Sequence, residues 1–396
     1  MKPSPSSLRD PAFVLLLAFL LLVPVSIAAC YVLGTLLLAL FLRHLLRGGK
    51  FPSLPFFSVF FAVFIVFTLL STFFSVDRAA SIRDNKELLI FLLFPIFFWV
   101  LRGRERIQLS LWTVLASAVF SALVGILATL RKGISLSDRL TGFTSHWMTY
   151  AGLLMLPFVF FSVRLLLLRR GRKQDGLLLA SLALLLAAIA FSLTRSVWLG
   201  IAAALGLFLV FFKPRLLLLA PLALAAVLLV PPAVKGRLLS IVDMQDKSNR
   251  DRIHMAYSGW KLFQDRPWTG VGSHNVEKVI ASDEARYRHP RAEKINPHLH
   301  NNFLQILAER GVLALAAFVL ACLFAILQMG RELKRCSSER RALVAGSLFA
   351  FVGFLVAGLF EYNFGDSEIK FLLFYFLSLP FIQWEGEEHV QPETDR

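Results

Sequence analysis

A short polar segment, residues 297–302, contains the side chains of this chain best suited to acid–base chemistry. It reads Pro-His-Leu-His-Asn-Asn and runs straight into an apolar stretch. An imidazole titrates near neutral pH, so His300 is the candidate general base for a hydroxyl group, with Asn301 beside it to orient that group. His298 is a candidate substrate contact, and no third ligand for a metal is evident near it. The pattern predicts a reactive site where a membrane helix begins.

Several arginines have positions that suit an anionic substrate. Arg195 stands between two apolar runs without a neighbouring charge, where a guanidinium is costly unless it has a partner, and its fork of N–H groups matches a phosphate. An arginine that only anchors the hairpin at the interface is the alternative. Arg250 and Arg252 open an expected helix whose positive end would favour phosphate, although simple solvation is an equal alternative for Arg250. Weaker candidates for guiding anionic headgroups are Arg83, Lys86 and Arg139.

Composition identifies the elements that must position these residues. With 57% hydrophobic residues, 38 Phe and a mean hydropathy of +0.67, the chain predicts an all-α polytopic membrane protein. Apolar runs of the length that crosses a bilayer recur along nearly the whole sequence. The twelve expected spans are 12–28, 30–46, 55–74, 87–101, 108–130, 147–168, 176–193, 197–212, 216–232, 302–328, 342–361 and 368–384.

The basic residues predict how the spans are oriented. Alternate short loops are rich in Lys and Arg, which favours a cytoplasmic location for those loops and for both termini. The net charge of +16 therefore indicates topology rather than a nucleic-acid partner. No clear cleavage site follows the first apolar run, so we expect an uncleaved first hairpin rather than a signal peptide.

Four regions follow from this topology. Residues 1–231 would hold nine spans, 232–301 one large periplasmic loop, 302–384 three further spans and 385–396 a disordered cytoplasmic tail. Residues 250–265 read as an amphipathic helix with aromatic side chains at helical spacing, for which packing against the bundle or the headgroup layer is a better explanation than sugar stacking. Trp260 and Trp268 nevertheless remain possible sugar platforms.

Several common chemistries lack their signatures. The three cysteines, Cys30, Cys322 and Cys336, have no paired spacing, so no disulfide framework or cysteine–metal site is indicated. The sequence contains no His-Glu-x-x-His, no phosphate-binding P-loop and no Gly-x-Ser-x-Gly. A metal site is not expected.

The segment His-Asn-Asn-Phe-Leu-Gln at 300–305, followed by Glu-Arg-Gly at 309–311, resembles the signature that opens the last helices of the O-antigen ligase and polymerase superfamily. Further similarity lies in Arg252 with Pro-Trp-Thr-Gly-Val-Gly at 267–272, and in the Thr-Arg-Ser hairpin around Arg195. Residues 139–149 and 360–367 are also similar to family segments, so the resemblance covers about the last two-thirds of the chain. One departure is Ala256, where the family often has Trp.

The resemblance implies a GT-C-like membrane glycosyltransferase of the Gram-negative inner membrane with its active site facing the periplasm. It would transfer a glycan from undecaprenyl pyrophosphate to a sugar hydroxyl of lipid A-core, with inversion at the anomeric carbon and without metal, ATP or other cofactor. His300 would be the base, and Arg195 and Arg252 would stabilise the departing pyrophosphate.

Other functions stay open from the sequence. An O-antigen polymerase or a protein O-oligosaccharyltransferase would use the same donor. Twelve spans with cytoplasmic termini also fit a secondary transporter, although no internal repeat is visible and Arg195, Arg252 and His300 fall at one face of nearly charge-free spans. A scaffold for envelope assembly is the remaining class.

Overall fold

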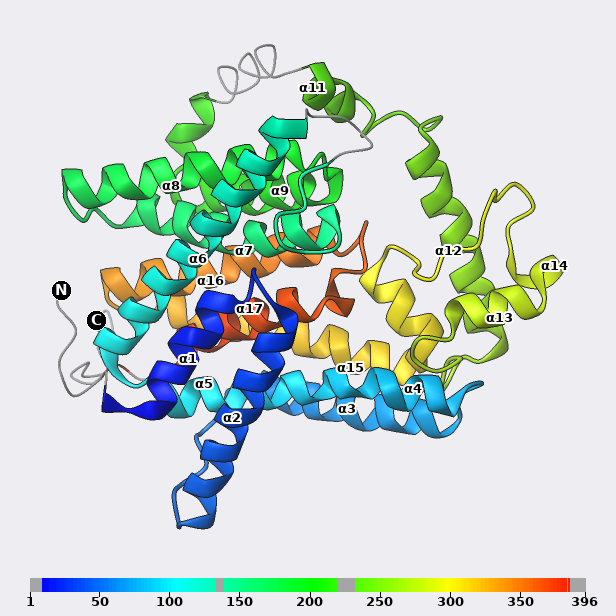
Figure 1. The fold of residues 1–396 in the computed structure, drawn as a ribbon, viewed down its shortest axis with the longest axis horizontal. Helices are drawn as coiled ribbons and strands as arrows, with labels where there is room; N and C mark the ends of the chain where they lie inside the picture. The colour runs from blue at the N-terminus through cyan, green and yellow to red at the C-terminus, as the bar shows by residue number, and fades with distance from the viewer. Residues whose placement is uncertain (1–8, 133–138, 220–231, 383, 385–396) are drawn as a thin grey trace, which may run out of the picture.

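The computed structural model describes residues 9–132, 139–219, 232–382 and 384, and within them it is helical without a β-strand (Figure 1). The predicted fold class, an all-α polytopic membrane protein, is therefore confirmed. The predicted tail at 385–396 and most of the span predicted at 216–232 lie outside the described residues. The α-helices are α1 (Pro11–Leu22), α2 (Ile27–Leu46), α3 (Phe57–Phe73), α4 (Arg78–Asp84), α5 (Leu93–Val100), α6 (Gly103–Lys132), α7 (Trp147–Leu167), α8 (Arg172–Phe191), α9 (Arg195–Phe212), α11 (Pro232–Leu239), α12 (Lys247–Asp265), α13 (Val276–Ser282), α14 (Glu284–Tyr287), α15 (Asn302–Leu333), α16 (Ser338–Ala357) and α17 (Ser367–Ser378).

Seven of the described helices, α2, α6, α7, α8, α9, α15 and α16, are long and apolar enough to cross a membrane by length and composition. The helices α1 and α3 are apolar but shorter. Two further predicted spans, 87–101 and 368–384, also contain only short helices. The segment predicted at 87–101 divides into a 3-10 helix, Asn85–Leu92, and α5, and all twelve residues of α17 are buried. These segments are apolar because they fill the protein core.

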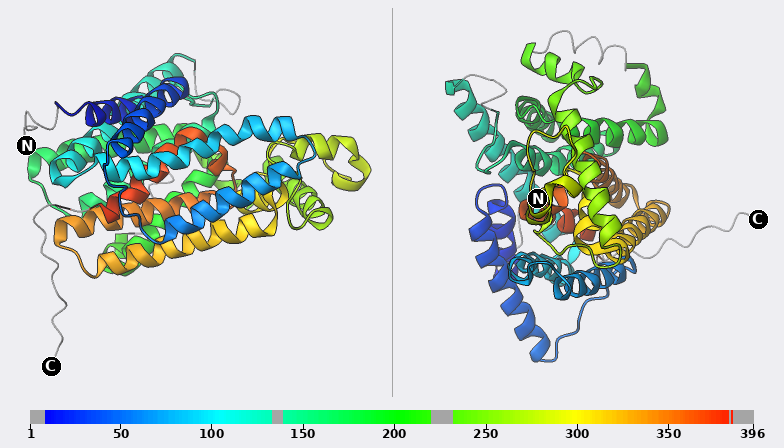
Figure 2. Two further views of the ribbon diagram at one scale, coloured as in Figure 1. Left: turned by 90° about the horizontal axis from the view of Figure 1, so that it is seen from below. Right: turned by 90° about the vertical axis from the view of Figure 1, so that its right-hand side faces the viewer.

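The centre of the bundle is built from α7, α16 and α17 (Figures 1 and 2). Nearly every residue of α7 is buried, and α16 packs along it on one side and against α9 on the other. Small residues permit the second contact, because a β-carbon on Gly200 would lie 2.6 Å from the carbonyl oxygen of Gly353. The helices α3 and α15 form another closely packed pair.

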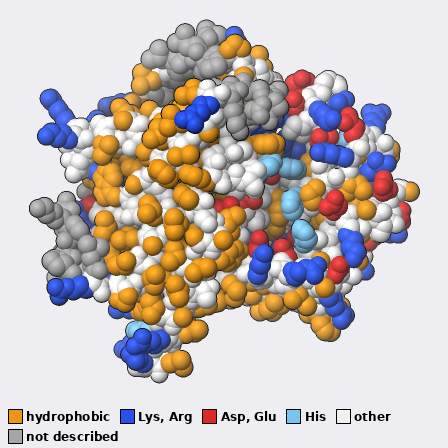
Figure 3. Space-filling view, in the orientation of Figure 1, with side chains coloured by type: hydrophobic (Ala, Val, Ile, Leu, Met, Phe, Trp, Pro, Cys, Tyr) orange, Lys and Arg blue, Asp and Glu red, His pale blue; other side chains and the backbone are white. Residues whose placement is uncertain are grey.

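On the face seen in Figure 3, acidic and basic side chains gather at one end, over α12 to α14. Apolar side chains cover most of the bundle on this face, groups of Lys and Arg stand at its other edges, and histidines follow the boundary of the charged region. This distribution is the one expected of a bundle in lipid with a polar segment outside it.

The amphipathic helix predicted at 250–265 is present as α12, which starts three residues earlier because Asp246 caps it by accepting from the N–H groups of Ser248 and Asn249. Its buried face consists of Met255, Ser258, Gly259 and Leu262 and packs against α15. The aromatic face points outward instead, and Trp260 is 52% exposed. Of the two surroundings expected for the aromatics, Trp260 does not have the bundle, and its contact with the headgroup layer stays a prediction.

Candidate active site

The amide side chains after His300 tie three segments of the chain together. Asn301 caps α15, since its Oδ1 accepts from the Leu304 N–H at 2.9 Å, and its Nδ2 donates to the Leu359 carbonyl at 2.9 Å. The buried Asn302 donates to Asn363 at 2.6 Å and accepts from the Phe364 N–H at 3.0 Å. Both residues therefore hold the turn after α16 against the start of α15.

Gln305 holds the other side of this junction. Its Oε1 accepts from the Leu299 N–H at 2.6 Å, and its Nε2 donates to Glu309 at 2.9 Å. The segment that carries His300 is thus fixed from both sides. His300 itself has a φ of +47°, a left-handed conformation that costs a non-glycine residue about 1–3 kcal/mol and persists only where the surroundings impose it.

This scaffold brings His300 against Glu361. The Nδ1 atom of His300 lies 2.9 Å from each carboxylate oxygen of Glu361, which comes from the segment between α16 and α17. A carboxylate at Nδ1 accepts the proton there and leaves Nε2 with its lone pair free. The pair can therefore act as an oriented general base.

A cavity of about 680 Å³ opens beside this pair. Five segments that are distant in the sequence contribute to it, namely α4 with the following 3-10 helix, the start of α7, the loop before α13, the segment before α15 and the segment before α17. The residues that line it are Ala80, Arg83, Asp84, Lys86, Glu87, Ser145, His146, Met148, Thr149, His274, Pro297, His298, His300, Glu309, Glu361, Tyr362, Gly365 and Asp366.

The environment of the cavity keeps two further histidines in their neutral form. Burial lowers the pKa of His298, and the nearby His300 and His274 lower it further. Burial likewise lowers the pKa of His146, and the carboxylate of Glu361 opposes that shift only in part. Asp366 behaves in the opposite sense, because burial and then Glu361 raise its pKa well above the ordinary range. The cavity is thus less highly charged than its residue types imply.

Arginines form a second cluster next to the cavity, around the single carboxylate of Asp246. Arg195, whose side chain is 5% exposed, donates to Asp246 at 2.8 Å and also to Ser240, and Arg237 lies 3.6 Å from the same carboxylate. Arg139 and Arg252 are close enough for their charges to act on Arg237. We call Arg139, Arg195, Arg237 and Arg252 the arginine cluster.

The cluster carries an excess of positive charge. Burial, followed by the charges of Arg195 and Arg139, lowers the pKa of Arg237 to about 10. Burial pushes the pKa of Asp246 upward, but the charges of Arg195 and Arg237 outweigh that effect and lower it. Asp246 therefore stays ionised and pairs with both Arg195 and Arg237.

Arg252 connects the arginine cluster to His300 and Glu361. Its Nε donates to the carbonyl of Phe360 at 3.0 Å, and its Nη1 donates to the Ser248 hydroxyl at 2.7 Å. Burial lowers the pKa of Arg252, and the adjacent carboxylate of Glu361 opposes the shift. The predicted catalytic residues His300, Arg252 and Arg195 are thus brought to one region of the structure.

The remaining predicted site residues differ in their placement. Arg83 and Lys86 are exposed and line the cavity with His298. Arg139 belongs to the arginine cluster and stacks on Trp147, with its guanidinium carbon 4.7 Å from the ring centre. Arg250 is exposed and lines no part of the cavity, and Asn301 uses both polar side-chain atoms within the protein.

The glycines of the Pro-Trp-Thr-Gly-Val-Gly and Glu-Arg-Gly motifs meet at a break in α15. Gly311 has a φ of +79° inside this helix, and the N–H of Val312 donates to Pro267 at 2.8 Å instead of continuing the helical pattern. The N–H groups of Val271 and Gly272 fill the gap by donating to the carbonyls of Ala308 and Glu309. A β-carbon on Gly311 would lie 2.1 Å from the carbonyl oxygen of Trp268, so only glycine fits.

The spans are less free of charge than the sequence suggested. Glu309, Arg310, Glu368 and Lys370 fall within predicted spans and are buried. Arg310 pairs with Glu309 at 2.9 Å, and Lys370 pairs with Glu87. Since Glu87 and Glu309 both line the cavity, these two ion pairs form part of its wall.

Sequence reasoning assigned no role to Glu361, Arg237 or His146. Glu361 and His146 stand in segments that resemble the family, and this resemblance was the signal in the sequence that could have identified them. Among the described residues, no three His, Cys, Asp or Glu side chains form a group that could hold a metal ion.

Comparison with known proteins bears on the region that contains His300, Arg252 and Arg195. Residues 180–319 match the family model described as O-antigen ligase. A protein of Rickettsia conorii, named as a candidate polysaccharide ligase, is 26% identical over 230 residues, which cover 55% of this chain and 53% of that protein. The chain thus spans about half the length of this relative. The resemblance drawn from the motifs is thus confirmed over residues 180–319, which are similar to the O-antigen ligase family.

Proposed function

We propose that this protein is a glycosyltransferase that joins a glycan from undecaprenyl pyrophosphate to a sugar hydroxyl of lipid A-core. The observation that carries the proposal is the contact of His300 with Glu361 at the wall of a cavity, next to an arginine cluster with unbalanced positive charge. A base and an anion site side by side are what transfer from a pyrophosphate requires. The similarity of residues 180–319 to the O-antigen ligase family supports this proposal.

His300 performs the first part of the reaction. Glu361 accepts the Nδ1 proton, so Nε2 removes the proton from the acceptor hydroxyl as its oxygen attacks the anomeric carbon. The new glycosidic bond forms while the bond from that carbon to the pyrophosphate oxygen breaks. One displacement of this kind inverts the configuration at the anomeric carbon.

The arginine cluster acts on the leaving group. The electron pair of the broken bond stays with the pyrophosphate, and the donors of Arg252, Arg195 and Arg237 stabilise the added charge. Asp246 fixes Arg195 and the start of α12 without cancelling the positive field. Arg83 and Lys86, on the exposed side of the cavity, guide the anionic headgroups of donor and acceptor.

The site would face the periplasm of a Gram-negative inner membrane. The loops rich in Lys and Arg mark the opposite side as cytoplasmic, and the segment 232–301 then forms the large periplasmic loop. The activated donor supplies the driving force, so neither ATP nor a metal ion is required.

The test is transfer in vitro by purified protein from undecaprenyl-pyrophosphate glycan to lipid A-core, with EDTA present and ATP absent. Product masses identify the acceptor. We expect glycan-modified lipid A-core from the wild type, and none from His300→Asn, with His289→Asn as the matched control. Elongated donor without modified lipid A-core would instead identify a polymerase. If correctly folded wild-type protein transfers no glycan at all, the proposal is contradicted.

A further inference from the structure

A second polar pocket lies at the end of the bundle opposite to His300. The helix α7 begins next to His146 of the active-site cavity and ends directly before Leu168, which lines this second pocket. Its 21 residues make a helix about 30 Å long, so the two sites are well separated. The helix α16 runs the opposite way, from Glu339 at the second pocket toward the segment that carries Glu361.

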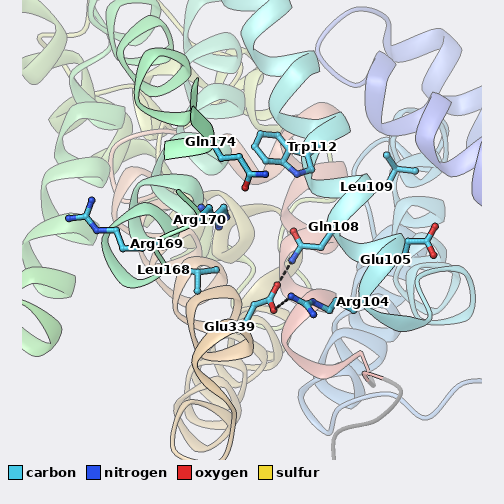
Figure 4. Close-up of a pocket in the computed structure, with 10 residues that line it drawn as sticks. All are labelled: Arg104, Glu105, Gln108, Leu109, Trp112, Leu168, Arg169, Arg170, Gln174 and Glu339. Atoms are coloured by element: carbon cyan, nitrogen blue, oxygen red, sulfur yellow. Dashed lines mark hydrogen bonds and ion pairs between the residues drawn. The ribbon is translucent and has the colours of Figure 1, made fainter. Parts of the chain in front are cut away.

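The pocket has a volume of about 380 Å³ and gathers arginines and amides (Figure 4). Glu339 turns toward Arg104 and Gln108 and is satisfied by an ion pair with the first and a hydrogen bond of 2.9 Å from the second. The residues that line the pocket are Arg104, Glu105, Gln108, Leu109, Trp112, Leu168, Arg169, Arg170, Gln174 and Glu339.

Three guanidinium nitrogens of Arg164 and Arg170, at or near this pocket, have no acceptor among the described residues. Arg164, in the last turn of α7, is only 1% exposed, and its Nε and Nη2 have no hydrogen-bond partner among the described residues. The first two charges that act on it are those of Arg170 and Glu339, both of which line the pocket. The buried Nη1 of Arg170 is likewise without a partner in the described part of the chain. A buried charged donor without an acceptor raises the free energy of the folded protein, so an anionic oxygen bound here would stabilise the site.

The backbone adds to the same potential. The helices α6, α8 and α16 all begin at this pocket, since Arg104, Gln174 and Glu339 lie in their first turns. A helix N-terminus carries partial positive charge and free N–H groups. The residue before α8 is Gly171, which has no side chain to cap that helix.

An adjacent apolar pocket indicates what kind of molecule bears the anion. It has a volume of about 750 Å³, shares Arg169 with the first pocket, and is walled by Leu165, Leu179 and Phe212. Lys213 and Arg215 stand on its rim. Both pockets lie at the ends of helices that are candidates for crossing the membrane, where a lipid places its phosphate beside its acyl chains.

We propose that Arg169, Arg170 and the neighbouring helix N-termini bind the phosphate of an anionic membrane lipid, in the leaflet away from His300, with the positive charge of the buried Arg164 close by. The acyl chains occupy the apolar pocket beyond Arg169. This lipid is separate from the donor and acceptor of the proposed transfer reaction, and its binding does not depend on that reaction.

The test measures lipid binding by native mass spectrometry of purified protein titrated in micelles with phosphatidylglycerol or phosphatidylcholine. We compare the wild type with Arg170→Gln and with Arg172→Gln, a matched control because Arg172 is exposed and lines neither pocket. A second variant, Arg169→Gln, changes an exposed side chain with little risk to folding. Inorganic phosphate, titrated alone, distinguishes a free ion from a headgroup.

Phosphatidylglycerol is expected to bind more tightly than phosphatidylcholine, with a Kd raised about tenfold by Arg170→Gln, about threefold by Arg169→Gln and not by Arg172→Gln. Equal binding by wild type and both pocket variants would overturn the proposal, as would equal affinity for the two lipids. Arg170-dependent binding of inorganic phosphate without binding of phosphatidylglycerol would overturn the lipid assignment.

Discussion

His300 and Glu361 are 61 positions apart in the chain, yet the imidazole Nδ1 lies 2.9 Å from the carboxylate. The contact exists because Asn301 and Asn302 bind the turn after α16 to the start of α15. An acid that fixes the tautomer of a histidine is a positioning residue, and its loss reduces rate more than affinity.

Glu361→Gln is therefore expected to lower kcat for glycan transfer about 100-fold while changing KM little, because an amide no longer enforces the proton on Nδ1. Steady-state kinetics with varied donor would measure both constants. Glu284→Gln, at an exposed residue of α14, is the control. A wild-type kcat in the Glu361→Gln variant would show that Glu361 does not position His300 for catalysis.

Arg237→Gln tests the arginine cluster through a residue that the motifs do not include. Arg237 shares Asp246 with Arg195, so its removal lowers the positive field seen by the pyrophosphate without breaking the hydrogen bonds of Arg195. We expect kcat/KM for the donor to fall about 10- to 100-fold. Arg291→Gln, an exposed arginine, should retain wild-type kinetics, and equal values for the two variants would refute a role for Arg237.

Gly311→Ala should destabilise the protein by about 2 kcal/mol or more, because alanine at a φ of +79° is strained and its β-carbon meets Trp268. Gly330→Ala is the matched control in the same helix, where nothing lies within 4 Å of the added carbon. That change should be neutral or stabilise by up to about 1 kcal/mol. Thermal unfolding would compare the variants, and equal effects would contradict the break in α15.

The neutral histidines of the cavity predict a pH dependence of stability. Burial, followed by His300 and His274, lowers the pKa of His298 below its ordinary value of 6.5, so between the two pKa values the unfolded chain binds more protons than the folded one. Stability is thus fully present above pH 6.5 and is lost as the pH falls toward the folded-state pKa. In thermal unfolding, His298→Asn should reduce this loss, and an unchanged pH slope would argue against it.

The sequence predicted the helical membrane fold and three candidate residues that the structure brings to one region, but it did not predict their partners. His300, Arg252 and Arg195 are recognisable because each is a polar group of unusual position beside an apolar run. Glu361 and Arg237 carry no comparable local signal, since their roles arise only from contacts with residues far away in the chain. Asn301 is the opposite case. The sequence suggested a substrate contact, whereas its side chain caps α15, and the two roles cannot be distinguished in a sequence.

The count of spans was limited for a related reason. Hydropathy does not give the length of a helix, so the spans predicted at 87–101 and 368–384 contain helices of only 8 and 12 residues, α5 and α17. For the aromatic residues of α12, the spacing defines an apolar face but does not decide whether the bundle or the headgroup layer covers it.

The central claim is that the imidazole of His300 removes the proton from the acceptor. The most direct test is the single-turnover rate of glycan transfer by His300→Ala, with donor binding measured separately and with free imidazole added. The account predicts a loss of about 1,000-fold at nearly unchanged donor affinity, and partial recovery with imidazole, which the cavity of about 680 Å³ can admit. A His300→Ala protein that transfers glycan at more than about a tenth of the wild-type rate would contradict it.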